Sequence, residues 1–253
     1  MTPEEQIQRG FGMLAEARER IQEQLNMTQG PERGQLRQQL WNCSRHEAHS
    51  LYLSQAGQDQ FIDQYLLNGK RDGVFVDVGG YDGCIGSNSY FFETVRGWSG
   101  LLIEPVRELC ETARAIRRCR CLNECVSETH GECEFVQITR GFTQMSGLRD
   151  SYAAHILQTV RAHPDHAEQS ITVRTRPLAE ILREHECFEI DCLFIDVEGA
   201  ENRILSAFPF GEFQITVCCL ENNSGDAEIG RLMARNGFEC VEFIGADEIY
   251  TAT

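Results

Sequence analysis

The first fifty residues carry an apolar pattern with the period of an α-helix. Between residues 4 and 25, apolar side chains recur at three- and four-residue spacing, interrupted by Arg18, at Ile7, Phe11, Leu14, Ile21 and Leu25. This pattern predicts an amphipathic helix, which Thr28, Gly30 and Pro31 are expected to end, and a second short helix over residues 33–41. We predict that this helical extension, residues 1–50, packs against the rest of the chain, forms a homodimer contact, or covers a binding site as a lid.

From residue 58 onward, helical periods alternate with short β-rich runs. Helices are predicted over 58–67, from 87, over 107–117 and 178–185, from 200 and over 226–236; strands are predicted over 73–78, 101–104, 119–126, 133–138, 171–175, 192–197, 215–221, 238–243 and 249–252. The alternation favours an α/β fold with a Rossmann-like, seven-stranded, mainly parallel sheet and helices on both faces. We therefore expect one domain over residues 51–253. The polar stretch 140–170 is long for a connection, which is typical of functional segments.

The charge of the chain narrows the class of partner. The formal net charge is −16, so a nucleic acid or an anionic membrane surface would be repelled. The basic stretch 114–120 lies among acidic neighbours and is interpreted as a solvated helix end. The chain has no apolar run long enough to span a bilayer, and MTPEEQIQRG has no features of a signal peptide, so a cytoplasmic location is expected.

Twelve cysteines are a high number, but most stand singly inside apolar runs, where a thiol behaves as a small hydrophobe. Cys119, Cys121, Cys125 and Cys133 are a candidate zinc set. Their spacing lacks paired C-x2-C knuckles, and a single strand over 119–126 would place the first three on one face. Packing in a core is therefore preferred to a zinc site.

The first predicted strand runs into a glycine-rich turn that contains Asp77, Gly79, Gly80 and Asp82. Glycines at a strand-to-helix turn let the backbone approach a ligand, and parallel sheets bind ligands at the carboxyl ends of their strands. The next strand ends at Glu104, where a carboxylate can accept both hydrogen bonds of a ribose diol. A nucleotide-like cofactor is predicted here. NAD stays open on these residues, although the turn lacks the full G-x-G-x-x-G pattern.

Two later strands also end in oxygen-bearing side chains. Asp196 and Glu198 end an otherwise apolar strand, Glu201 stands in the first turn of the next helix, and Glu221 and Asn222 end the following strand. Burial of such charges without a partner is costly, which marks the first pair as candidate catalytic residues. Glu201 is also explained by the dipole of its helix.

Several segments, in the order found here, resemble the FkbM-type methyltransferases. They are SQAGQDQF (54–61), VFVDVGGYDGCIGSNSYFFE (74–93), GWSGLLIEP (97–105), NECVSETHGECEF (123–135), SGL (146–148) and DCLFIDVEGAENRIL (191–205). The resemblance covers roughly residues 54–252. It implies a class I methyltransferase fold, S-adenosylmethionine as methyl donor, and O-methylation of a small hydroxyl-bearing acceptor such as a sugar or natural product.

The resemblance also implies roles for individual residues. Asp77, Gly79 and Asp82 would hold the methionine moiety and shape the cofactor loop, and Glu104 with Pro105 would lie at the ribose. Other implied cofactor contacts are Gln58, Asp59, Gly80, Ser87, Asn88, Asn123, Val126, Ser127 and Asp196. A helix cap or a turn is the plainer explanation for Asp82 and Ser87.

The two acidic strand ends are similar to those of the metal-dependent catechol-type O-methyltransferases. Asp196, Glu221 and Asn222 match that set in type, and oxygen ligands would select Mg²⁺, Ca²⁺ or Mn²⁺. A carboxylate alone can also deprotonate the acceptor. A histidine often stands at the position of Asn222 in the FkbM-type pattern, and without it Glu198 or Asp196 is the predicted base.

Other histidines and other activities give weaker predictions. His46, His49, His155, His163 and His166 lie in predicted loops or helices, and His155 and His163 are in the stretch 140–170, which can fold over an acceptor. An NAD-dependent oxidoreductase or epimerase usually has a Tyr-x3-Lys pair, and the single lysine, Lys70, has no tyrosine placed for it. A catalytically inactive methyltransferase fold that serves as an interaction module is the remaining alternative.

Overall fold

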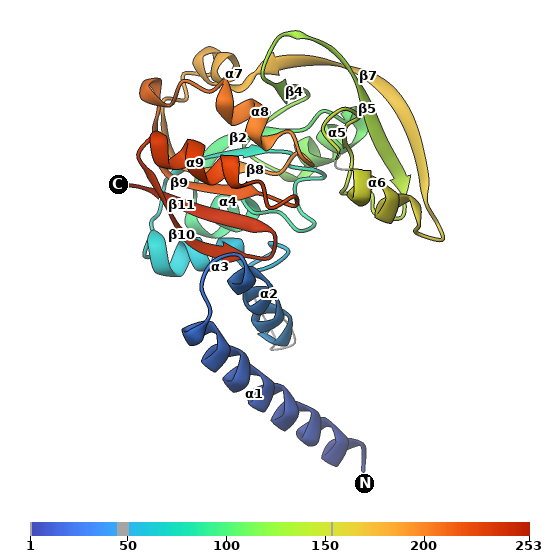
Figure 1. Cartoon of the computed structure of the whole chain (residues 1–253), viewed down its shortest axis with the longest axis vertical. Helices are drawn as coiled ribbons and strands as arrows, with labels where there is room; N and C mark the ends of the chain where they lie inside the picture. The colour runs from blue at the N-terminus through green and yellow to red at the C-terminus, as the bar shows by residue number, and fades with distance from the viewer. Residues whose placement is uncertain (1, 45–50, 153) are drawn as a thin grey trace.

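The computed structural model describes residues 2–44, 51–152 and 154–253. A seven-stranded sheet forms the centre of the fold (Figure 1). Its order is β10 (Phe238–Ile244), β11 (Asp247–Ala252), β9 (Gln214–Glu221), β8 (Glu189–Ile195), β1 (Val74–Val78), β2 (Ser99–Ile103) and β3 (Arg120–Leu122). Strands β9, β8, β1, β2 and β3 run parallel, whereas β11 pairs antiparallel with both β9 and β10. The predicted α/β class and seven-stranded, mainly parallel sheet are confirmed.

Apolar side chains fill both faces of this sheet, because helices cover both. On one face, Leu193 and Ile195 pack with α7 (Leu178–Glu184), α8 (Glu201–Ser206) and α9 (Ala227–Arg235). On the other, Phe75 and Phe194 pack with α4 (Tyr90–Arg96) and the π-helical turn η1 (Ile62–Leu66), and Leu102 packs with α5 (Arg107–Ile116). A strand buried on both faces has no alternation of polar residues, which explains the continuous apolar runs of β1, β2 and β8. The short helices α3 (Gln58–Phe61) and η2 (Phe210–Glu212) complete the domain.

A second sheet, which the sequence did not predict, stands beside the first. Its order is β4 (Cys125–Ser127), β7 (Ala167–Pro177), β5 (Gly131–Arg140) and β6 (Gly147–Leu148). The long β5–β7 pair extends beyond the main sheet, with α6 (Ala154–Arg161) beside it (Figure 1). The single strand predicted over 119–126 is wrong: the chain forms β3 and β4, which belong to different sheets. The stretch predicted as a polar connection, 140–170, contains β6, α6 and the ends of β5 and β7.

The N-terminal extension forms α1 (Pro3–Met27) and α2 (Glu32–Ser44). Helix α2 packs against β10, where Glu242 accepts hydrogen bonds from Arg33 and Arg37 at 2.7 Å each. Helix α1 packs on α2 and projects from the body of the protein (Figure 1). The domain boundary at residue 50 and a homodimer through this extension stay predictions. Among the described helices, none is both long and apolar enough to cross a bilayer.

Candidate functional site

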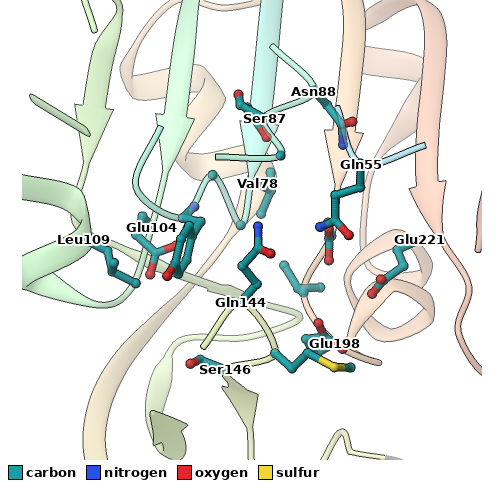
Figure 2. A pocket seen from close by; sticks show the side chains of 18 of the residues that line it. Gln55, Val78, Ser87, Asn88, Glu104, Leu109, Gln144, Ser146, Glu198 and Glu221 are labelled. Atoms are coloured by element: carbon teal, nitrogen blue, oxygen red, sulfur yellow. The ribbon is translucent and has the colours of Figure 1, made fainter. Parts of the chain in front are cut away.

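A cavity of about 430 Å³ lies at the ends of β1, β2, β8 and β9. These strands are parallel neighbours, so their carboxyl ends meet at one edge of the sheet, where open α/β folds bind ligands. The volume is in the range of small-molecule sites. Figure 2 shows Glu104 and Leu109 on one side of the cavity and Glu198 and Glu221 on the other. Gln144, from the segment between β5 and β6, lies between them.

The glycine turn after β1 forms the floor of the cavity. The backbone N–H groups of Gly79 and Gly80 both donate to the carbonyl oxygen of Ile103, at 2.9 and 3.2 Å. Gly79 has φ +89°, and a Cβ there would lie 1.8 Å from the carbonyl oxygen of Asp196. A Cβ on Gly80 would lie 2.4 Å from the Leu102 side chain. Both glycines are therefore required by the packing of β1 against β2 and β8, and both line the cavity.

Glu104 follows β2 and is held by two backbone N–H groups. Tyr81 donates to its Oε2 at 3.0 Å and Val106 donates to its Oε1 at 2.8 Å. These contacts fix the carboxylate at the cavity wall. Burial raises the pKa of Glu104 to about 8, and the charges of Asp77 and Asp196 add to this rise.

Asp77, at the end of β1, joins a buried network behind the cavity. It accepts a hydrogen bond from the Ser89 hydroxyl, and Arg117 donates to the same hydroxyl at 2.9 Å. Arg117 also pairs with Glu93. Burial raises the pKa of Asp77, against the effect of Ser89 and Arg117. The predicted solvated helix end at 114–120 is therefore wrong at Arg117, which supports the carboxylate of Asp77 from behind.

Most of the predicted cofactor residues line the cavity. Besides Asp77, Gly79, Gly80 and Glu104, they are Gln58, Ser87, Asn88, Pro105, Val126 and Asp196. Asn88 is notable because its Oδ1 is buried without a hydrogen-bond partner among the described residues. Such an atom is costly unless a ligand supplies a donor.

The structure does not bring four of the predicted cofactor side chains to the cavity. Asp82 accepts from the N–H groups of Cys84 and Ile85 at 2.9 and 2.8 Å, so it shapes a turn. Asn123 donates to the carbonyl oxygens of Glu104 and Pro105 at 3.0 and 2.9 Å, which holds the end of β2. Ser127 donates to Glu128 at 2.6 Å, and Asp59 accepts from the N–H of Leu53 at 2.7 Å.

Three carboxylates gather at the other end of the cavity. Oxygens of Asp196, Glu198 and Glu221 lie within 4.8 Å of one another. Burial raises the pKa of Asp196 to about 7, and the charge of Asp247 adds to it. Burial and the neighbouring charge of Asp196 raise the pKa of Glu198 and of Glu221 well above the usual range. Asp196 can therefore exchange a proton near neutral pH, and the three carboxylates together are a candidate cation site.

Asn222 does not belong to this cluster, which corrects the predicted metal set. Its Nδ2 donates to the Asp226 carbonyl oxygen at 3.1 Å and to Glu248 at 2.8 Å. Its Oδ1 accepts from the N–H of Asp226 at 2.7 Å. The amide caps the turn before α9, and Glu198 takes its place beside Asp196 and Glu221. The prediction grouped Glu221 with Asn222, but consecutive residues at a strand end point to different sides of the sheet.

Five polar or flexible cavity residues that were not predicted come from segments other than the carboxyl ends of β1, β2, β8 and β9. Gln38 belongs to α2, Gln55 precedes α3, Asp247 begins β11, and Gln144 and Met145 lie between β5 and β6. Gln55 stands inside the SQAGQD segment, which was a usable signal. No periodicity or motif marks the others, because their approach depends on how α2 and the second sheet fold over the first.

None of the histidines with described side chains lines the cavity. His163 contacts Phe142 with ring centroids 4.8 Å apart, and His166 lies 3.0 Å from Glu168. The side chains of His46, His49 and His155 lie outside the described residues. No lysine, arginine or histidine lines the cavity within the part of the chain that the structure describes.

One family model and two solved structures match this chain. A family model described as "Methyltransferase FkbM domain" matches residues 77–240. Among solved structures, a TehB-like SAM-dependent methyltransferase from Corynebacterium glutamicum aligns with a TM-score of 0.40 at 11% identity, covering 88% of this chain and 100% of that one. Methyltransferase FkbM from Methylobacillus flagellatus aligns with a TM-score of 0.48 at 11% identity, covering 91% of this chain and 57% of that one. A comparison with curated protein sequences gives no significant match.

Proposed function

Because the chain belongs to the FkbM methyltransferase family, we propose that it transfers a methyl group from S-adenosylmethionine to a hydroxyl oxygen of a small, sugar-like or natural-product-like acceptor. The charge of the cavity carries this proposal. Its carboxylates are Asp77, Glu104, Glu124, Asp196, Glu198, Glu221 and Asp247, and no basic side chain lines it within the described residues. Such a cavity attracts a sulfonium cation and repels the pyrophosphate of NAD.

The cofactor occupies the Glu104 side of the cavity. Glu104 accepts the two hydroxyl groups of the ribose, since each of its oxygens has one backbone donor and a free acceptor position. Gly79 and Gly80 let the backbone approach the methionine moiety. The buried Oδ1 of Asn88 accepts a donor from the ligand. Val126 and Leu109 provide apolar surface for the adenine.

The acceptor occupies the side of the acidic cluster. Side-chain amides of Gln38, Gln55, Gln144 and Asn223 line the cavity. Amides both donate and accept hydrogen bonds, which suits a hydroxyl-bearing molecule. The absence of basic side chains among the described lining residues disfavours a phosphorylated acceptor.

Methyl transfer is a direct displacement. The acceptor oxygen forms a bond to the methyl carbon, the carbon–sulfur bond breaks with its electron pair left on sulfur, and S-adenosylhomocysteine leaves. Without a cation at these carboxylates, the hydroxyl proton passes to Glu198 or Asp196, and from there to water. A pKa of about 7 suits Asp196 to that task, because a base works best when its pKa lies near the operating pH. The site has only to align the two reactants and to receive one proton.

Calorimetric titration with S-adenosylmethionine and S-adenosylhomocysteine tests the cofactor assignment. We expect binding by the native chain, and a loss of about 10- to 100-fold in affinity for Glu104→Gln, since the neutral amide gives up charge-assisted hydrogen bonds to the ribose. Glu124→Gln is the matched control, because Glu124 lines the same cavity but pairs with Arg176 at 2.9 Å. Equal losses in both variants would argue against a direct ribose contact. No binding by the native chain would favour an inactive interaction module.

The affinity for the cofactor is expected to rise with pH. Burial raises the pKa of Glu104 to about 8, and its ionised form is the better acceptor for the ribose. Affinity for 5′-methylthioadenosine, which lacks the titrating amino acid part, should therefore increase at least about tenfold between pH 6 and pH 9. In Glu104→Gln the profile should be flat. A flat profile for the native chain would contradict the ribose role of an ionised Glu104.

A further inference from the structure

We propose that Asp196, Glu198 and Glu221 bind one divalent cation at the acceptor end of the cavity. The binding site itself is independent of the proposed function, because these three side chains build it. Only the role of the cation in methyl transfer rests on the proposed function. Their oxygens lie within 4.8 Å of one another, close enough for one ion to contact all three at ordinary carboxylate–metal distances. Figure 2 shows Glu198 and Glu221 on the same side of the cavity.

The backbone delivers these side chains from two neighbouring strands. Asp196 and Glu198 follow β8, and Glu221 is the last residue of β9. The strands pair in parallel up to Ile195 and Leu220, so the acidic residues follow at the same edge. Glu198 is 7% exposed and its Oε2 accepts one hydrogen bond, at 3.3 Å from Asn223. All three side chains of the cluster line the cavity.

A second, independent observation points to a missing ligand. Oε2 of Glu221 is buried and has no hydrogen-bond partner among the described residues. A buried carboxylate oxygen without a donor is costly, and a cation in the cavity would be a partner for the ionised group. Glu221 lines the cavity, so a ligand in the cavity can reach it.

Buried carboxylates elsewhere in the described chain have either an arginine nearby or at least two hydrogen-bond donors. Hydrogen-bond donors alone hold Glu104, Glu201 and Asp247. Asp63 pairs with Arg96 at 2.7 Å, Glu242 pairs with Arg33 and Arg37 at 2.7 Å, and Glu93 pairs with Arg117. The three-carboxylate cluster has no such arginine, and no basic residue lines the cavity among those described. S-adenosylmethionine brings one net positive charge, and it binds at the Glu104 side. A divalent cation supplies the charge that this end of the cavity lacks.

An all-oxygen donor set indicates a hard cation: Mg²⁺, Mn²⁺ or Ca²⁺. A cation here would lower the pKa of a coordinated acceptor hydroxyl, and the released proton would go to water. Asp196 and Glu198 would then act as ligands, and neither would serve as the base in the cation-bound protein.

The test measures Mn²⁺ binding to the chelator-treated full chain by loss of the free-ion electron paramagnetic resonance signal. We expect one Mn²⁺ per chain and a loss of at least about tenfold in affinity in Glu221→Gln and in Glu198→Gln, variants that keep side-chain shape. Glu104→Gln is the matched control, since it removes a cavity carboxylate outside the cluster. Glu104→Gln should keep its affinity for Mn²⁺ and bind 5′-methylthioadenosine more weakly. Glu221→Gln should bind Mn²⁺ more weakly and keep its affinity for 5′-methylthioadenosine.

The two ligands separate this proposal from the cofactor assignment. Mn²⁺ binding without nucleoside binding would leave the cation site standing and refute the proposed donor. Nucleoside binding without Mn²⁺ binding would overturn the cation site, as would Mn²⁺ affinity unchanged in both cluster variants. Circular dichroism of each variant confirms that the fold is kept before the affinities are compared.

Discussion

Replacement of Gly79 by alanine is expected to destabilise the protein by about 3–5 kcal/mol and to abolish cofactor binding. The new Cβ would lie 1.8 Å from the Asp196 carbonyl oxygen. That oxygen cannot move aside cheaply, because Asp196 follows β8 and its N–H donates to Val78 in β1 at 3.0 Å. The backbone at φ +89° adds strain for any residue with a side chain. Relief of the clash would separate β1 from β8 at the floor of the cavity.

Gly237→Ala is the control that separates the steric clash of the new Cβ from the backbone strain of a positive φ. Gly237 has a similar φ, +80°, but a Cβ there would meet its nearest atom, in Thr253, at 3.8 Å. We expect a cost of only about 1–2 kcal/mol and unchanged affinity for S-adenosylmethionine. Urea denaturation gives both free energies of unfolding, and calorimetry gives both affinities. Equal stability of the two variants would contradict the close approach of β1 and β8 at Gly79.

The sequence predicted the central sheet because its signals are local. The apolar runs of β1, β8 and β9 are buried on both faces, and the helices between them have clear periods. The same strands carry Asp77, Asp196 and Glu221 at their ends. Parallel strands bring their carboxyl ends together, so the general place of the site followed from the order of elements.

The second sheet and the cavity wall that it supplies did not follow from local signals. Residues 119–126 have one apolar pattern but divide between β3 and β4, because tertiary pairing with β2 and β7 overrides the local period. Gln144 reaches the cavity only through the β5–β6 pairing. Gln38 reaches it only because α2 packs on β10. Contacts of this kind depend on which distant segments meet, and one sequence gives no measure of that.

The burial of Arg117 was also hidden from the sequence. Four arginines between residues 114 and 120 have the composition of a solvated helix end, yet the Arg117 side chain is 0% exposed and its partner Glu93 is 2% exposed. Arg117 also donates to the Gly83 carbonyl oxygen at 2.9 Å and to Ser89, which donates to Asp77. Its position is set by α4 and the cofactor loop, which lie far from it in the chain.

Replacement of Arg117 by leucine is therefore expected to lower the free energy of unfolding by about 3–5 kcal/mol. The change leaves the Glu93 carboxylate buried without its arginine, although Glu93 keeps hydrogen bonds from the N–H groups of Arg118 and Cys119. It also removes the positive charge nearest to the buried Asp77. We expect weaker binding of S-adenosylmethionine in the fraction that stays folded, since the Ser89–Asp77 pair loses its support. Urea denaturation followed by fluorescence measures the loss.

The double variant Arg117→Leu/Glu93→Met distinguishes an uncompensated charge from simple loss of packing. If the charge dominates, the double variant should be more stable than Arg117→Leu alone, because no buried carboxylate is left unpaired at position 93. Arg107→Leu serves as the control: its ion pair with Glu111 is exposed, and no measurable change in the denaturation midpoint is expected. A double variant as unstable as the sum of both single changes would show that the pair acts through its shape and hydrogen bonds. The buried network would then support the cofactor loop by packing and hydrogen bonds, and the charges of Arg117 and Glu93 would not contribute to the free energy of unfolding.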